Sequence, residues 1–164
     1  MNFNLENLTT KQLLQLENQV IEHLLERGLV RTRNKPIGDL AEAAVSLALG
    51  GTLAANSKAS FDFEIGDKRV QVKALQLSSD RAISKFQFSA FREPFGFDTC
   101  VFVVFDNNSD IDLAIEVGVP EIKMLGRFSS HTNSYTIRYI QILELGEDKR
   151  GDVTELVQRA WNKL

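Results

Sequence analysis

The hydrophobic pattern changes from a helical period to a strand period near residue 52, and this change constrains the fold more than any other feature. Apolar residues recur at helical spacing over residues 9–27 and again over 37–49. From Thr52 onward they alternate with polar residues, as in "SFDFEI" and "RVQVKAL". Two helices followed by several strands predict one α/β or α+β domain.

The two N-terminal helices carry boundary signals. Thr9 and Gln12 have the spacing of a capping box, and Gly28 fits the end of the first helix. The densest basic segment of the chain, "LVRTRNKP", follows it. The second helix ends at Gly50-Gly51, so the first third of the chain is expected to be helical apart from this linker.

The second half of the chain predicts further strands and a closing helix. The continuous apolar run "CVFVVFD" is typical of a central strand that is covered on both faces. We expect strands over 112–117 and 134–143, a short helical turn over 120–125 and a last helix that begins at Asp152. No repeat or linker divides the chain. We therefore expect a single domain over 1–164, with an N-terminal helix and basic linker (1–35), a core (36–117) and a C-terminal strand and helix (118–164).

Composition limits the class of protein. The formal net charge of −3 provides no global positive field, so nucleic-acid binding must come from a local basic patch. Cys100 is the only cysteine, which excludes a disulfide within the chain, and we interpret it as a buried core thiol. There is no leader pattern and no apolar run of about 20 residues. We expect a cytoplasmic protein without a membrane partner.

The hairpin predicted over residues 60–73 carries the candidate site. A Gly-Asp turn signal lies between its two alternating runs. Because side chains alternate along a strand, Asp62 and Glu64 share one face of the first run, and Gln71 and Lys73 share one face of the second. Folding the hairpin then brings Asp62 near Gln71 and Lys73, with Glu64 as a reserve carboxylate. The same pattern also fits an ordinary hairpin whose polar face meets solvent.

These residue types suit metal-dependent chemistry. Carboxylate and carbonyl oxygens are ligands that Mg²⁺ and Mn²⁺ prefer. Lys73 beside such a cation can activate water or stabilise charge on a phosphate. Glu42, on the preceding helix, can add a second carboxylate, although a single glutamate on a helix is more often a solvated surface residue. Together these residues favour in-line attack of water on a phosphodiester.

The stretch "GDLAEAAV … SFDFEIGDKRVQVKA" resembles the PD-(D/E)XK nuclease superfamily, which has the restriction-endonuclease-like fold. That fold is a mixed central β-sheet flanked by helices, and here it would carry an added N-terminal helix. The resemblance covers about residues 38–75. It implies that Asp62 is the metal-binding aspartate, that Gln71 and Lys73 occupy the (D/E)-x-Lys motif, and that Glu42 is the helical glutamate.

Two positions depart from the family pattern. Gln71 stands where the family has Asp or Glu, which removes one negative charge but is similar to the Gln-x-Lys of the Mrr-like branch. Phe61 stands where a proline often precedes the aspartate. The resemblance implies a Mg²⁺- or Mn²⁺-dependent deoxyribonuclease of restriction or repair type. Its metal ligands would be Asp62, Gln71, Glu42 and the main-chain carbonyl of Val72. The alternative is a weakened nuclease-fold module that binds DNA or a protein partner.

Binding partners follow from three further features. Arg31, Arg33, Lys35 and Lys58 are candidate contacts to DNA phosphates, although the first three also fit a solvated linker. The segment 81–98 interleaves basic residues with phenylalanines, a pattern that suits nucleic-acid binding or a packed core. A double-strand cutter of this size predicts a homodimer. The first helix is then either the dimer face or packed on its own domain.

Overall fold

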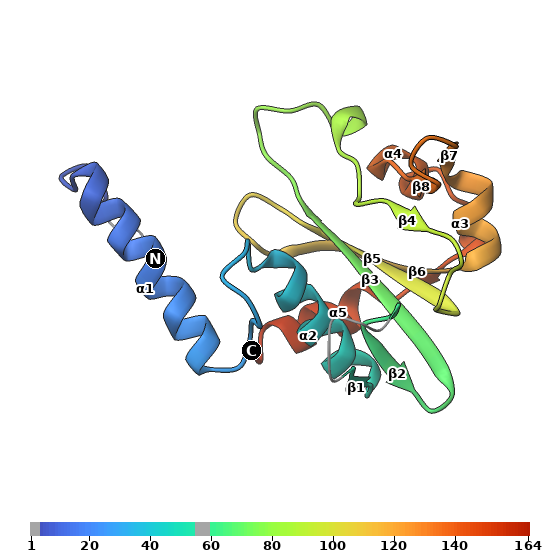
Figure 1. The fold of residues 1–164 in the computed structure, drawn as a ribbon, viewed down its shortest axis with the longest axis horizontal. Coiled ribbons are helices and arrows are strands. Elements are labelled where there is room, and N and C mark those ends of the chain that lie inside the picture. The colour runs from blue at the N-terminus through green and yellow to red at the C-terminus, as the bar shows by residue number, and fades with distance from the viewer. Residues whose placement is uncertain (1–3, 55–59) are drawn as a thin grey trace.

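A mixed β-sheet forms the centre of the protein, whose computed structural model describes residues 4–54 and 60–164 (Figure 1). Within this described part the sheet has six strands in the order β1-β2-β3-β5-β6-β9. Strands β3 and β5 are parallel, and the other neighbouring pairs are antiparallel. The strands are β1 (Thr52–Leu53), β2 (Phe63–Ile65), β3 (Lys68–Gln76), β5 (Thr99–Phe105), β6 (Ile111–Gly118) and β9 (Gly151–Asp152). The predicted α/β class with a mixed central sheet is confirmed.

Two helices, α2 (Ile37–Leu49) and α5 (Thr154–Trp161), cover one face of this sheet. Helix α2 presents Ala41 and Ala44, whose small side chains are fully buried and allow the helix to approach the sheet closely. The strand residues beneath the two helices are Val70, Val72, Val101 and Val103. These residues are the apolar half of the alternating pattern in β3 and half of the continuous apolar run in β5.

The opposite face of the sheet is covered by the phenylalanine-rich segment and the C-terminal region. Phe88 and Phe102 meet edge to face with ring centroids 4.7 Å apart. The phenylalanines of segment 81–98 are therefore mainly core residues, and its basic residues are exposed. Cys100 is buried as predicted, and burial raises the pKa of its thiol well above the ordinary value. Helices α3 (Val119–Leu125) and α4 (Tyr139–Leu143) complete this layer.

A second, smaller sheet lies in the same layer. Its three strands, counted over the described residues, have the order β4-β8-β7 and are all antiparallel. Their bounds are β4 (Phe91–Arg92), β7 (Arg127–Ser129) and β8 (Ser134–Thr136). The single strand predicted over 134–143 is therefore wrong in its second half, where helix α4 forms. At the start of this helix the Arg138 N–H donates to the Gln141 side chain at 2.8 Å. This local cap favours a helix although the isoleucines of residues 139–143 favour a strand.

Helix α1 (Thr10–Glu26) extends away from the body of the protein (Figure 1). The predicted capping box of Thr9 and Gln12 is present, and none of the helix residues is buried. The Arg27 side chain at the end of α1 contacts the Leu164 carbonyl at the C-terminal end of the chain. Arg33, in the segment after α1, pairs with Glu22 of α1 itself. Among the described residues, no helix combines the length and the apolar content needed to cross a bilayer.

Candidate functional site

The hairpin of β2 and β3 positions the first site residues. Ile65 pairs with Lys68, so the chain reverses through Gly66 and the residue after it. Gly66 has φ of 56°, a left-handed conformation that glycine adopts without a steric cost. This tight turn sets the register of the two strands. It places Asp62, which directly precedes β2, beside Gln71 of β3.

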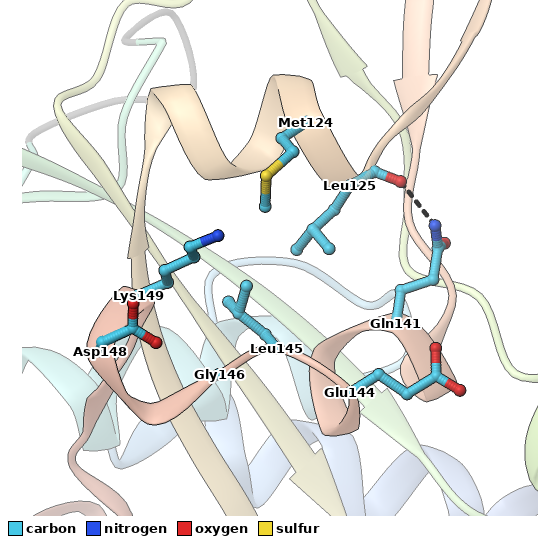
Figure 2. Close-up of a pocket in the computed structure, with 8 residues that line it drawn as sticks. All are labelled: Met124, Leu125, Gln141, Glu144, Leu145, Gly146, Asp148 and Lys149. Carbon is cyan, nitrogen blue, oxygen red and sulfur yellow. Dashed lines mark hydrogen bonds between the residues drawn. The ribbon is translucent and has the colours of Figure 1, made fainter.

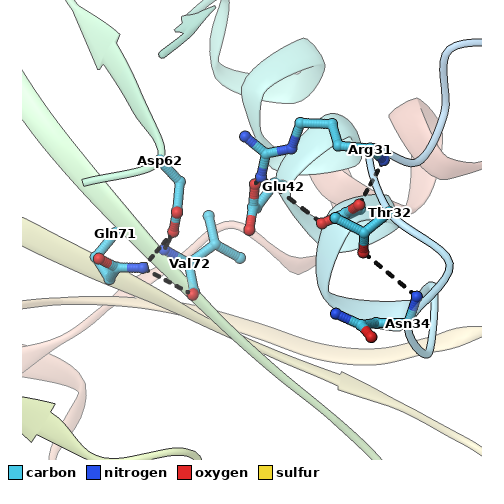
Figure 3. A network of polar contacts seen from close by, with 8 residues as sticks. Arg31, Thr32, Asn34, Glu42, Asp62, Gln71 and Val72 are labelled. Atoms are coloured by element: carbon cyan, nitrogen blue, oxygen red, sulfur yellow. Dashed lines mark hydrogen bonds and ion pairs between the residues drawn. The ribbon is translucent and has the colours of Figure 1, made fainter. Parts of the chain in front are cut away.

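The Asp62 carboxylate is held against the edge of β3 (Figure 3). Its Oδ2 accepts the backbone N–H of Val72 at 2.6 Å and also the side-chain amide of Gln71. The same Gln71 amide donates to the Val72 carbonyl at 3.4 Å. The amide therefore lies where two oxygens converge. Because amide nitrogen and oxygen exchange places by a rotation, Gln71 Oε1 can join these two oxygens around one cation.

Glu42 reaches the same region from helix α2. Its side chain is only 15% exposed and pairs with the Arg31 guanidinium, which comes from the basic linker. Asp39, one turn earlier on α2, anchors this arginine, because its Oδ2 accepts the Arg31 backbone N–H at 2.6 Å. A second contact joins the Arg31 guanidinium to Asp39 Oδ1 at 3.7 Å. Figure 3 shows Arg31 and Glu42 on one side and Asp62, Gln71 and Val72 on the other.

Burial acts on both carboxyl groups, and the charge of Asp62 also acts on Glu42. Burial, and then the charge of Asp62, raises the pKa of Glu42 to about 7, against the opposing charges of Arg31 and Lys73. Burial also raises the pKa of Asp62, although the hydrogen bond from Val72 and the charge of Lys73 lower it. Two half-buried acids, one of which raises the pKa of the other through its charge, create a local potential that favours a bound proton or a cation.

Lys73 completes the cluster from β3. Its Nζ lies 5.2 Å from the ring centroid of Phe91, within the range of a cation–π contact. Among the ion pairs of the described residues, none includes Lys73. The half-buried ammonium therefore remains available to an anionic group such as a phosphate.

Of the five residues predicted for the catalytic and metal site, hydrogen bonds join Asp62, Gln71 and Val72. Glu42 and Lys73 lie near enough for charge to act between each of them and Asp62, but Glu42 comes from the α2 side of the sheet and Lys73 lies against Phe91 on the other side. Glu64 does not join them, since it is exposed and faces Arg69 in the strand register. No three His, Cys, Asp or Glu side chains gather as a metal-binding group anywhere in residues 4–54 and 60–164. A cation would therefore depend on amide and main-chain oxygens in addition to carboxylates.

The four predicted DNA contacts have different surroundings. Arg31 lies at the site, beside Glu42. Arg33 is paired with Glu22 of α1, and Lys35 is exposed. Lys58 lies outside the described residues. Arg31 is thus the one of the described three that the structure places next to the candidate chemistry.

Sequence reasoning misses two residues of the site. Asp39 holds Arg31 in place, and the only sequence signal for this role is its i, i+3 spacing from Glu42 on one face of the helix. Phe91 lies beneath Lys73 but belongs to a distant segment, and no local pattern indicates such a contact.

Other hollows of the described surface lie away from this cluster. One cavity of about 440 Å³ opens between α3 and α4 (Figure 2). Its lining mixes Met124, Leu125 and Leu145 with exposed charged residues, and its Gln141 amide is already used by the Leu125 carbonyl at 2.5 Å. The described residues that line it include no convergent pair of carboxyl groups and no buried base. The cluster at the edge of β3 is therefore the better candidate for catalysis.

Comparison of the chain with protein-family models and with curated proteins found no match. The functional interpretation consequently rests on the geometry of the cluster and on the resemblance carried by residues 38–75.

Proposed function

We propose that the protein is a divalent-cation-dependent nuclease that hydrolyses phosphodiester bonds in DNA. The observation that carries this proposal is the convergence of Asp62, Gln71 and the Val72 carbonyl at one point, with Lys73 and Glu42 near enough for their charges to act on it. This is the arrangement that the resemblance to PD-(D/E)XK nucleases implies. A role in restriction or repair follows from the same resemblance.

Each residue of the cluster has a distinct role in this proposal. Asp62, the Val72 carbonyl and Gln71 Oε1 would hold Mg²⁺ or Mn²⁺, and Glu42 would add a second carboxylate. The cation would supply positive charge that polarises the phosphate and lowers the pKa of the attacking water. Lys73 would donate a hydrogen bond to a phosphate oxygen, where negative charge increases in the transition state. Arg31 would contact a neighbouring phosphate of the strand.

Cleavage of supercoiled plasmid and of single-stranded DNA tests this proposal. We expect cutting in the presence of Mg²⁺ or Mn²⁺ and none in EDTA. Cutting that continues undiminished in EDTA would contradict the proposal, because the attacking water would then be activated without the cation that the proposed reaction requires.

One observation favours a second candidate function, a nuclease-fold module that binds DNA or a protein partner without cutting. The Gln71 amide nitrogen already occupies the point where the Asp62 and Val72 oxygens converge, so the cluster satisfies its own hydrogen bonds. A site of this kind needs no cation. Addition of Mn²⁺ would then leave the unfolding temperature unchanged, whereas a cation-binding site would raise it.

We also propose that α1 pairs with α1 of a second copy of the chain. Leu13, Leu14, Leu16 and Val20 are 37–56% exposed. Antiparallel pairing would place Leu13 of one helix against Leu24 of the other. It would also place Lys11, near the start of one helix, beside Glu26, whose side chain is 73% exposed near the end of the other. Parallel pairing would instead align like charges.

Replacing Val20 with glutamate should therefore convert a dimer into a monomer, because it adds charge to the apolar stripe. Gln15→Glu is the matched control, since Gln15 lies on the side of the helix away from Leu13, Leu14, Leu16 and Val20. Sedimentation velocity over a range of concentrations measures the result. A wild-type protein that stays monomeric at every concentration would contradict the pairing.

A further inference from the structure

The three-stranded sheet has an inner face and an outer face. Phe91 and Phe128 both lie opposite Tyr135 in the strand register. The rings of Phe128 and Tyr135 are 4.9 Å apart, and the ring of Tyr135 lies 5.7 Å from Phe95. These aromatic side chains mark the inner face. The residues that alternate with them along each strand must point the other way.

Three arginines lie on the outer face. Arg92 is opposite Ser134, and Arg127 is opposite Thr136. Arg138 follows Thr136 by two residues and remains in extended conformation, where it bridges to the segment before β4, so it shares the same face. All three arginines are exposed, and none of them takes part in the ion pairs found among the described residues. We call this surface the arginine face.

Two adjoining hollows open on the arginine face. The first, about 340 Å³, is lined by Arg127, Arg138 and Thr136 together with Gln87, Ile140 and Gln141. The second, about 410 Å³, shares Arg127 and Thr136 and adds His131, two serines and Phe128. Among the described residues that line the two hollows, none is an aspartate or glutamate. Hydrogen-bond donors without acidic neighbours are the chemistry that recognises phosphate.

We propose that the arginine face binds single-stranded nucleic acid. Arg127 and Arg138 would contact successive phosphates, with the Thr136 hydroxyl between them. Phe128 belongs to the inner side of the sheet, but on edge strand β7 its ring is 48% exposed and lines the second hollow beside Arg127, where it would stack on an unpaired base. Because the whole chain has a net charge of −3, this local set of arginines is the kind of basic patch that nucleic-acid binding requires.

The arginine face is separate from the candidate catalytic cluster. Phe91 of β4 contacts Lys73 on the inner side, whereas its neighbour Arg92 points outward. Binding to the arginine face therefore requires no cation. The inference extends the proposed nuclease function, since it assigns an unpaired strand to the substrate, but it can be tested without any cleavage.

Fluorescence anisotropy with labelled oligo(dT) and a length-matched duplex, in EDTA, tests this inference. We expect the wild type to bind the single strand more tightly than the duplex. The double variant Arg127→Gln/Arg138→Gln should bind oligo(dT) about tenfold more weakly. It should also lower the slope of log affinity against log salt by about 1.4, since each lost contact to a single strand removes about 0.7. Phe128→Ala should weaken binding about tenfold with an unchanged slope.

The matched control is Arg159→Gln/Lys163→Gln, which removes two charges from the α5 end of the chain and should leave affinity and slope unchanged. Unfolding temperatures of all variants confirm that they fold. Equal affinity and slope in wild type and the Arg127/Arg138 variant would overturn the inference. Tighter binding of the duplex than of oligo(dT), or no binding of oligo(dT), would also overturn it. So would displacement of oligo(dT) by polyglutamate at matched charge, because the face would then recognise any polyanion. Arginine-dependent binding without cation-dependent cleavage would reject the proposed nuclease function and retain this inference.

Discussion

Replacing Asp62 with asparagine should lower cation-dependent cleavage of DNA by about a thousandfold or more, because the cation would lose its central carboxylate. The substitution keeps the shape of the side chain, and its amide oxygen can still accept the Val72 N–H that Asp62 accepts at 2.6 Å. We therefore expect the hairpin to fold as before. Initial rates of plasmid nicking, with the unfolding temperature of each protein, measure the effect.

Glu64→Gln is the matched control for this prediction. Glu64 lies two residues from Asp62 on the same hairpin, but it is exposed and faces Arg69. We expect its loss to change the rate by less than about twofold, as for a surface substitution away from the site. Equal loss of cleavage in both variants would show that hairpin stability, rather than the Asp62 carboxylate, limits the reaction. Full activity in both would place the chemistry elsewhere.

Replacing Glu42 with glutamine should stabilise the cation-free protein at pH 8 by about 2 to 3 kcal/mol. Burial raises the pKa of Glu42 from 4.5 to about 7, so ionisation of this group costs free energy only in the folded state. Below pH 4.5 the carboxyl is protonated in both states and the substitution should have little effect. The gain should develop between pH 4.5 and 7 and then stay constant, because the folded protein holds the extra proton in that range.

Urea denaturation in EDTA at several pH values measures this gain. Glu155→Gln is the control, because the Glu155 side chain is 87% exposed on α5 and its replacement should leave the pH profile unchanged. A Glu42→Gln variant that is less stable than wild type at pH 8 would contradict the prediction. Such a result would mean that the Arg31–Glu42 pair stabilises the fold by more than the burial of its carboxylate costs.

The elements that are predictable from the sequence are those set by local signals. The alternation in 60–73 and the glycine turn determine which strand residues meet, so the pairing of Asp62 with Gln71 follows from the sequence alone. The capping box of Thr9 and Gln12 marks the start of α1 in the same way. Both features depend on residues within a few positions of one another, which is the range over which backbone preferences act.

Contacts between distant segments cannot be predicted in this way. The sequence makes Arg31 a candidate contact to DNA phosphates or part of a solvated linker, and neither reading indicates that the fold pairs this arginine with Glu42 of α2. The sheet of β4, β8 and β7 joins short segments from two regions of the chain. Only β8 lies within a predicted strand, and no local pattern predicts β4 or β7. The residues of 139–143 have strand-like composition, yet their capping by Gln141 and the helical spacing of buried Tyr139 and Ile142 produce a helix.

Calorimetric titration of Mn²⁺ at pH 8 into wild type, Asp62→Asn and Glu64→Gln tests most directly whether the cluster is a cation site. Our account predicts one saturable site in the wild type, the same site in Glu64→Gln and its loss in Asp62→Asn. Equal binding in all three proteins, or none in the wild type, would contradict the assignment of Asp62, Gln71 and Val72 as cation ligands.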